Sequence, residues 1–85
     1  MKVTVLFFAA LREQLGRPRE ELELPVGVST VGGLRDHLRA RGGEWANVFA
    51  PNRPVRAAVN QEMVQPVATI SAGDEVAFFP PVTGG

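Results

Sequence analysis

Residues 3–9 read VTVLFFA, a run that is β-branched, aliphatic or aromatic at nearly every position. Such a run is typical of a β-strand that is covered on both faces. Because the side chains of a strand alternate between its two faces, the run divides into two sets. One set is Val3, Val5 and Phe7, and the other is Thr4, Leu6 and Phe8.

Further strands and helices are indicated by the patterns that follow this run. We expect a short helix over 10–15 that Gly16 ends, and a strand over 20–24. A main helix should begin after Ser29 or Thr30 and end at Gly42 and Gly43, followed by an amphipathic turn over 44–49. Strands are expected over 55–59 and 62–64, joined by Asn60 and Gln61, and a last strand over 74–79. One main helix can cover only one face of a small mixed sheet. The sequence therefore predicts an α+β domain of the β-grasp, or ubiquitin-like, type over residues 1–79, followed by an extended tail over residues 80–85.

The predicted main helix carries Gly32 and Gly33 in its first turns. Each glycine weakens the helix by about 1 kcal/mol relative to alanine, and the neighbouring sequence gives no reason for them. No Lys-Ser/Thr pair follows, which argues against a phosphate-binding loop. In the turn after this helix, Trp45 and Phe49 are predicted to fill the core.

The composition excludes several functional classes. Nine Lys and Arg balance nine Asp and Glu without a block of like charge, which argues against nucleic acid as a partner. The absence of cysteine excludes disulfides, thiolate metal sites and cysteine nucleophiles. No apolar run approaches the length of a membrane span, and the strand pattern starts at once without a signal peptide. We therefore expect a cytoplasmic protein with no nucleic-acid or membrane partner.

Conventional catalytic side chains are scarce. His37 is the only histidine, and it lies on the polar side of the main helix without a Ser, Cys or carboxylate partner at a suitable spacing. Asp74 and Glu75 are neighbours in a strand, so we expect a turn-capping Asp and a solvated Glu instead of an acid pair. No metal-ligand spacing occurs. The sequence therefore predicts no metal site, no cofactor bound by this chain and no catalysis by its own side chains.

A surplus of apolar residues falls on the sheet face that the helix leaves uncovered. By strand alternation, this face carries Leu6 and Phe8 from the first strand and Phe79 from the last, with Met63 as a neighbour. A contiguous apolar patch of this kind usually marks a partner site. The alternative is that these side chains complete a small core by packing against loops.

The last six residues are Pro80, Pro81, Val82, Thr83, Gly84 and Gly85. The two prolines fix φ and bias the chain toward extended geometry, so they should launch the tail outward. The two glycines lack a Cβ, so they can enter a narrow channel and leave the last carboxylate open to attack from either side. This carboxylate is the leading candidate for the reactive group, to be activated as an acyl group. The alternative is a frayed end or a cloning remnant.

Three segments resemble the small subunit of molybdopterin synthase. They are VLFFA at 5–9 followed by LRE at 11–13, AAVNQ at 57–61, and GDEVAFFPPVTGG at 73–85. The resemblance implies a β-grasp sulfur carrier of molybdenum cofactor biosynthesis, whose Gly85 carboxylate is adenylated by an ATP-dependent activating enzyme and then converted to a thiocarboxylate. It also implies that this terminus enters the active site of a large subunit, within a heterotetramer, and gives sulfur to cyclic pyranopterin monophosphate.

Two other functions stay open at this point. The chain can be a sulfur carrier for thiamine or transfer-RNA thiolation, which the acceptor enzyme that co-purifies with it would reveal. It can also be a ubiquitin-like protein modifier, in which Gly85 forms an isopeptide with a lysine, or a plain interaction module. A Gly-Gly remnant on cellular lysines would separate protein modification from sulfur transfer.

Overall fold

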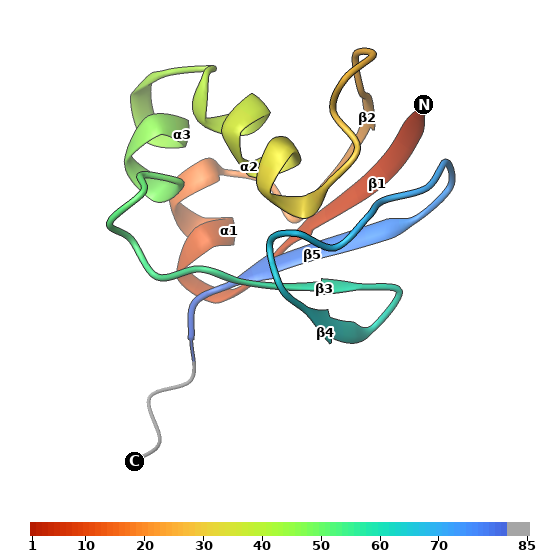
Figure 1. Cartoon of the computed structure of the whole chain (residues 1–85). Coiled ribbons are helices and arrows are strands. Elements are labelled where there is room, and N and C mark those ends of the chain that lie inside the picture. The colour runs from red at the N-terminus through yellow and green to blue at the C-terminus, as the bar shows by residue number, and fades with distance from the viewer. Residues whose placement is uncertain (82–85) are drawn as a thin grey trace.

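The computed structural model describes residues 1–81, and in it a five-stranded mixed sheet carries three helices on one face (Figure 1). The strands are β1 (Lys2–Phe7), β2 (Arg19–Glu23), β3 (Arg56–Val59), β4 (Glu62–Val64) and β5 (Glu75–Phe79). The helices are α1 (Ala9–Leu15), α2 (Val31–Arg39) and α3 (Gly43–Val48). The strand order is β2-β1-β5-β3-β4, with β1 and β5 parallel in the centre and the other neighbours antiparallel. The predicted β-grasp fold is confirmed.

The inner face of the sheet and the three helices form one core. Five residues of the central strands expose at most 1% of their surface: Val3, Val5, Phe7, Val76 and Phe78. The helices contribute Leu11, Leu34, Leu38 and Val48 to the same cluster. Val3, Val5 and Phe7 are all buried, whereas Thr4 and Leu6 are only half-buried. The predicted division of the first strand into two sets is therefore confirmed.

Aromatic rings join the helical layer to the sheet. The ring centroids of Phe7 and Trp45 lie 5.5 Å apart in an edge-on arrangement, and those of Phe49 and Phe78 lie 5.1 Å apart. Such pairs contribute about 0.5–1.5 kcal/mol beyond their buried area. Phe49 is fully buried and Trp45 is half-buried, so the prediction that they fill the core is confirmed. Trp45 lies in the helix α3 and Phe49 is its C-cap, so the predicted amphipathic turn is a short helix.

The junction of β1 and α1 differs from the prediction, because β1 ends at Phe7 and not at Ala9. Phe8 remains extended, with φ −120° and ψ 156°, but Ala9 has a positive φ of 53°. This left-handed conformation is uncommon for a residue with a Cβ, and here it turns the chain out of the sheet into α1. Gly16, with φ 74°, ends α1 as predicted.

The start of α2 explains the two glycines that the local sequence left unexplained. Thr30 caps the helix, since its Oγ1 accepts a hydrogen bond from the Gly33 N–H at 3.0 Å. The Gly32 N–H donates to the Pro66 carbonyl at 2.8 Å, and a Cβ on Gly32 would lie 3.2 Å from that oxygen. A Cβ on Gly33 would likewise crowd Thr30 Oγ1 at 3.3 Å. The reason for Gly32 is therefore a contact with a distant loop.

Arg35 of α2 fixes the segment that connects α3 to β3. Its Nε donates to the Phe49 carbonyl at 3.2 Å, and its Nη2 donates to the carbonyls of Ala50 and Arg53 at 2.6 and 2.7 Å. Burial lowers the pKa of Arg35, but a guanidinium keeps its charge in proteins. One side chain thus satisfies three carbonyls of a connection that has no regular structure.

Candidate functional site: the outer sheet face and the base of the tail

The sheet face opposite the helices carries a row of apolar side chains that crosses four strands. Leu6 of β1 is paired with Ala77 of β5, Ala77 with Ala58 of β3, and Ala58 with Met63 of β4. Paired residues of neighbouring strands project to the same side of a sheet. We call Leu6, Ala77, Ala58 and Met63 the outer apolar row.

Phe8 and Phe79 extend this row toward the end where β5 leaves the sheet. Phe79 is the last residue of β5 and is half-buried. Phe8 follows β1, and its extended backbone continues the alternation that places Leu6 outward. Phe8 exposes 44% of its surface and Met63 exposes 55%. The structure therefore places all four predicted partner-binding residues on one face, although their contact with a partner stays a prediction.

Ala58 and Ala77 were not among the predicted site residues. They lie in the middle of the outer apolar row, between the larger Leu6 and Met63. Ala58 exposes only 7% of its surface and Ala77 is half-buried, so their methyl groups form the low middle of the row between larger side chains. Sequence alternation places Ala58 and Ala77 outward, and that signal could have found them if small residues had been weighed with the large ones.

The base of the tail adjoins this face. Pro80 and Pro81 follow β5 directly and are half-buried. Proline has no N–H for a strand ladder, which agrees with the end of β5 at Phe79. The predicted functional tail continues through Val82, Thr83, Gly84 and Gly85, which lie outside the described residues. Phe79 is paired across the sheet with Arg56 of β3, which is exposed.

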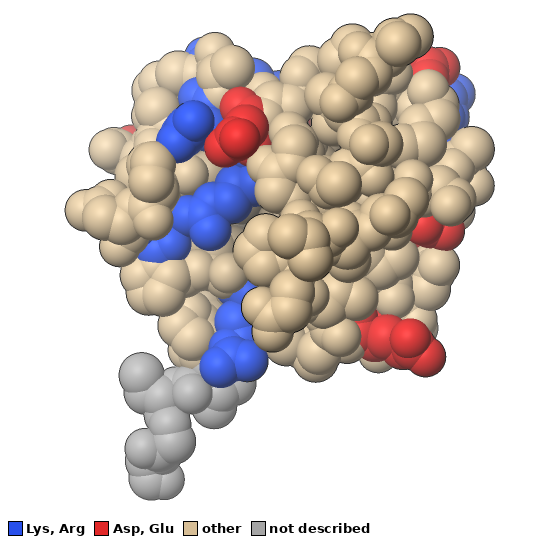
Figure 2. All heavy atoms as spheres, in the orientation of Figure 1, with Lys and Arg blue, Asp and Glu red and all other residues tan. Residues whose placement is uncertain are grey.

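On the β2 side, charges of both signs border the outer apolar row. On the outer face, Arg19 is paired with Leu6, and Glu21 is paired with Thr4. In the orientation of Figure 1, Figure 2 shows the basic side chains as separate groups, with acidic and uncharged atoms between them. A nucleic-acid site needs a concentrated basic surface, which this view does not present.

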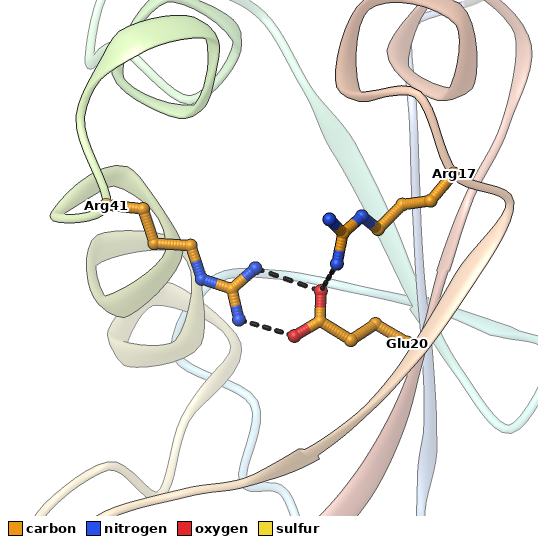
Figure 3. Close-up of polar contacts among 3 residues, drawn as sticks. All are labelled: Arg17, Glu20 and Arg41. Carbon is orange, nitrogen blue, oxygen red and sulfur yellow. Dashed lines mark hydrogen bonds and ion pairs between the residues drawn. The ribbon is translucent and has the colours of Figure 1, made fainter.

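An ion cluster on the helical side of β2 was missed by the sequence reasoning. Glu20 accepts hydrogen bonds from Arg17 at 2.8 Å and from Arg41 at 2.9 Å, and Arg41 binds both carboxylate oxygens (Figure 3). The two guanidinium groups also lie over the Trp45 ring, at 5.5 and 4.4 Å from its centroid. The hydrogen bond from Arg41 lowers the pKa of Glu20, against the opposing effect of burial. The cluster fastens β2 to the segment that follows α2.

Of the predicted polar groups, Asp74 has the setting that the sequence indicated, whereas Glu75 is half-buried and not fully solvated. Asp74 accepts hydrogen bonds from the Ser71 N–H at 2.8 Å and from Asn60 Nδ2 at 3.0 Å, which lower the pKa of Asp74. It therefore caps the turn before β5, as predicted. His37 lies in the last turn of α2 and is half-buried. Within residues 1–81, no three His, Asp or Glu side chains gather in a way that could hold a metal ion.

A groove of about 390 Å³ lies between α2 and the β3–β4 hairpin. Its walls include Val31 and Arg35 from α2, and Val55, Met63 and Pro66 from the hairpin and its flanks. The Arg35 guanidinium is already hydrogen-bonded to the three carbonyls described above. Its charge is therefore not available to a ligand in the groove. In the described part of the chain, no helix has the length and apolar character that crossing a bilayer requires.

Comparison with known proteins agrees with the observed fold and identifies the family. The molybdopterin synthase sulfur carrier subunit of Escherichia coli (strain K12) is 43% identical over 83 residues, which cover 98% of this chain and 99% of the relative. The crystal structure of small archaeal modifier protein 1 from H. volcanii superposes with a TM-score of 0.77 at 28% identity, covering 95% of this chain and 98% of the other.

A protein–protein complex of subunits 1 and 2 of molybdopterin-converting factor from Helicobacter pylori contains a chain with the same fold, at a TM-score of 0.68 and 21% identity, with both chains covered completely. A family model described as the ThiS family matches residues 5–85, which is nearly the whole sequence. The chain belongs to the ThiS family.

Proposed function

We propose that this chain is the sulfur-carrier subunit of a molybdopterin synthase, acting in molybdenum cofactor biosynthesis. The observation that carries the proposal is the continuity of an uncovered apolar face with the C-terminal motif on one strand. β5 contributes Ala77 and Phe79 to that face and passes directly into Pro80 and the tail. Similarity to named sulfur carriers over nearly the full length of both chains supports the same function.

The proposed chemistry resides in the Gly85 carboxylate. A free carboxylate is a poor acyl donor, so an activating enzyme first joins it to the α-phosphorus of ATP and releases pyrophosphate. A sulfur donor then attacks the acyl carbon, the C–O bond to AMP breaks, and a thiocarboxylate remains. The large subunit would position cyclic pyranopterin monophosphate, and the thiocarboxylate sulfur would attack it as a nucleophile. The side chains of this carrier bind partners and present the terminus, and ATP belongs to the activating enzyme.

The outer face has the proposed role of docking. Leu6, Phe8 and Met63 would contact the large subunit, with Phe79 at the centre of the contact next to the tail. Apolar side chains of this size are the usual anchors of protein interfaces. The expected assembly is a heterotetramer with two carriers at the ends of a large-subunit dimer. Docking on this face would place the tail at the large subunit's active site.

A second candidate function is protein modification, which the similarity to small archaeal modifier protein 1 favours. In that case Gly85 would form an amide with a lysine of a target protein. A Gly-Gly remnant on cellular lysines, identified by mass spectrometry, would support it. Carriage of sulfur to thiamine or transfer RNA remains a further alternative, and co-purification of the acceptor enzyme would reveal it.

The experiment that tests the proposed function measures the intact mass after incubation with the host's activating enzyme, ATP and a sulfur source. We expect one terminal oxygen to be replaced by sulfur, and the product to convert the pyranopterin substrate when the large subunit is added. Deletion of Gly85 should abolish both results while the circular dichroism spectrum stays native. Gly84→Val should also fail, because a β-branched side chain thickens the tail. Full sulfur transfer by the Gly85 deletion would overturn the proposal.

A further inference from the structure

The basic residues of this chain are almost all arginine. The sequence contains one lysine, Lys2, against eight arginines. The difference matters beside an activated carboxyl group. A lysine amine that loses its proton attacks acyl carbons, whereas a guanidinium stays protonated and does not. The inference below rests on the proposed function, because only an activated Gly85 needs protection from amines.

Lys2 lies at the end of the sheet that is remote from the tail. Its carbonyl accepts a hydrogen bond from the Gly73 N–H at 2.8 Å, and the parallel pairing of Thr4 with Glu75 fixes the same register. The chain therefore passes Lys2 before β5 begins and leaves the sheet after Phe79. At about 3.3 Å per residue, these two points lie roughly 20 Å apart along the strand. Figure 1 shows the start of β1 and the exit of β5 at opposite ends of the sheet.

The tail would need its full length to cover that distance. Residues 80–85 span at most about 20 Å when fully extended. To reach Lys2, the chain would have to reverse at Pro80 and Pro81 and lie back along the whole sheet. Proline favours extended geometry in the residue before it, which opposes such a reversal. The amino group of Met1, next to Lys2, is engaged as well, since it donates to the Leu24 carbonyl at 3.2 Å and pairs with Glu23 at 2.8 Å.

The base of the tail, in contrast, carries a cation that is not a nucleophile. Arg56 is exposed and is paired with Phe79, the residue after which the tail begins. The Cα atoms of paired residues in neighbouring antiparallel strands lie about 5 Å apart. An amine at position 56 would therefore lie beside the base of the tail. Arginine keeps the positive charge at this position without the reactivity.

We infer that the placement of arginine and lysine shields the activated terminus from the chain's own amines, and that Lys2 is the one side chain at which a second copy can be acylated. In that reaction, the Lys2 nitrogen attacks the Gly85 acyl carbon of another molecule and a C–N bond forms. The bond from the acyl carbon to its leaving group breaks, and the proton of the amine passes to solvent. The product is a covalent dimer.

The test uses a Gly85 thioester made by intein cleavage, so that the acyl donor does not depend on the activating enzyme. Four full-length proteins are compared by intact mass and peptide mapping: the parent, Arg56→Lys, Ala72→Lys and Lys2→Arg. Ala72 is the matched control position, because it is exposed and lies in the turn before β5, at the end remote from the tail. An internal amide has the mass of one water less than the hydrolysed chain.

We expect Arg56→Lys to form the internal amide at least about tenfold faster than Ala72→Lys or the parent, because of these positions only 56 places an amine beside the base of the tail. The parent should form a Gly85–Lys2 dimer at a rate that rises with protein concentration, and Lys2→Arg should form none. An internal amide at Lys2 in the parent, or equal rates for the lysines at 56 and 72, would overturn the inference. So would a dimer joined at another residue.

A second experiment, with ATP and the activating enzyme, separates failure of the proposed function from failure of the shielding inference. If the thioester results are as expected but ATP and the activating enzyme yield no adenylate on any of the four proteins, the proposed function fails while the shielding geometry stands. If adenylation and sulfur transfer proceed on the parent but the thioester of Arg56→Lys does not cyclise faster than the control, the shielding inference fails and the proposed function stands.

Discussion

The two faces of the central sheet are built from alternate residues of the same strands, yet only one of them is covered. On the inner face, Phe7 and Phe78 are excluded from water by the helices. On the outer face, Leu6 and Phe79 remain half-exposed and Met63 exposes 55% of its surface. Burial of an apolar side chain contributes roughly 1.5–3 kcal/mol to stability, so the inner face accounts for folding. The outer face retains apolar surface that a partner can still bury.

The largest effect should come from a charge on the inner face. Phe7→Asp places an unpaired carboxylate in a core that, within residues 1–81, holds no buried polar residue, and should cost at least about 4–5 kcal/mol, a large part of the stability of a small domain. We expect an unfolded protein by circular dichroism at 25 °C. Phe7→Leu is the control, which should stay folded with a lower midpoint in urea. A folded Phe7→Asp with a native midpoint would contradict the division of the sheet into two faces.

A charge on the outer face should act on binding and not on folding. Phe79→Asp should weaken binding of the large subunit by about 3–4 kcal/mol, a hundred- to a thousandfold in Kd, because the carboxylate is desolvated in the complex without a partner. The urea midpoint should change far less than for Phe7→Asp.

Calorimetry of the Phe79→Asp and Phe79→Leu proteins with the large subunit separates charge from size. Phe79→Leu should keep most of the affinity. If Phe79→Asp binds as the parent does, the partner site lies elsewhere. If it unfolds as completely as Phe7→Asp, the outer face belongs to the core.

A smaller effect is expected at the Glu20 cluster, which fastens the helices over the inner face. Glu20→Gln removes the charge that Arg17 and Arg41 share, and should cost about 1–2 kcal/mol at pH 7. The pKa of Glu20 in the folded protein lies below its ordinary value of 4.5, so its contribution is complete above that pH and is lost as the pH falls through the lowered value.

The difference in urea midpoint between Glu20→Gln and the parent should therefore be constant from neutral pH down to about 5 and should close at more acidic pH. Arg19→Gln is the control, because Arg19 faces outward. Its free energy of unfolding should stay within about 0.5 kcal/mol of the parent value. If the stability difference between Glu20→Gln and the parent grew as the pH fell, the pKa of Glu20 would not be lowered in the folded protein.

The fold could be predicted from the sequence largely because alternation and helix ends are local signals. Val5 and Phe7 were assigned to the covered face from their spacing alone, and Gly16 marked the end of α1 correctly. The cause of Gly32 could not be predicted, because the oxygen that excludes a side chain there belongs to Pro66. The cluster of Glu20 and Arg41 was missed for the same reason, since the two residues meet only in the folded chain.

For the candidate site, the large apolar residues could be predicted from the sequence, but the small ones could not. Leu6 and Phe79 stood out because large apolar residues on an uncovered face are conspicuous, and the structure places them there. Ala58 and Ala77 share that face, but a methyl group gives no comparable signal in a sequence. The prediction for Gly85 rests on its chemistry and on the family, since that residue lies outside the described part of the chain.

The parallel pair at the centre of the sheet has a consequence for how the chain matures. β1 and β5 are the first and last strands in sequence, and Thr4 is paired with Glu75. Contacts between such distant segments form late and slow folding. During synthesis, β1 has no parallel partner until β5 has left the ribosome, and the carrier tail follows β5 directly. The tail is therefore made only after every strand of the sheet has been synthesised, so a chain that carries the tail already holds all the strands that it needs to fold.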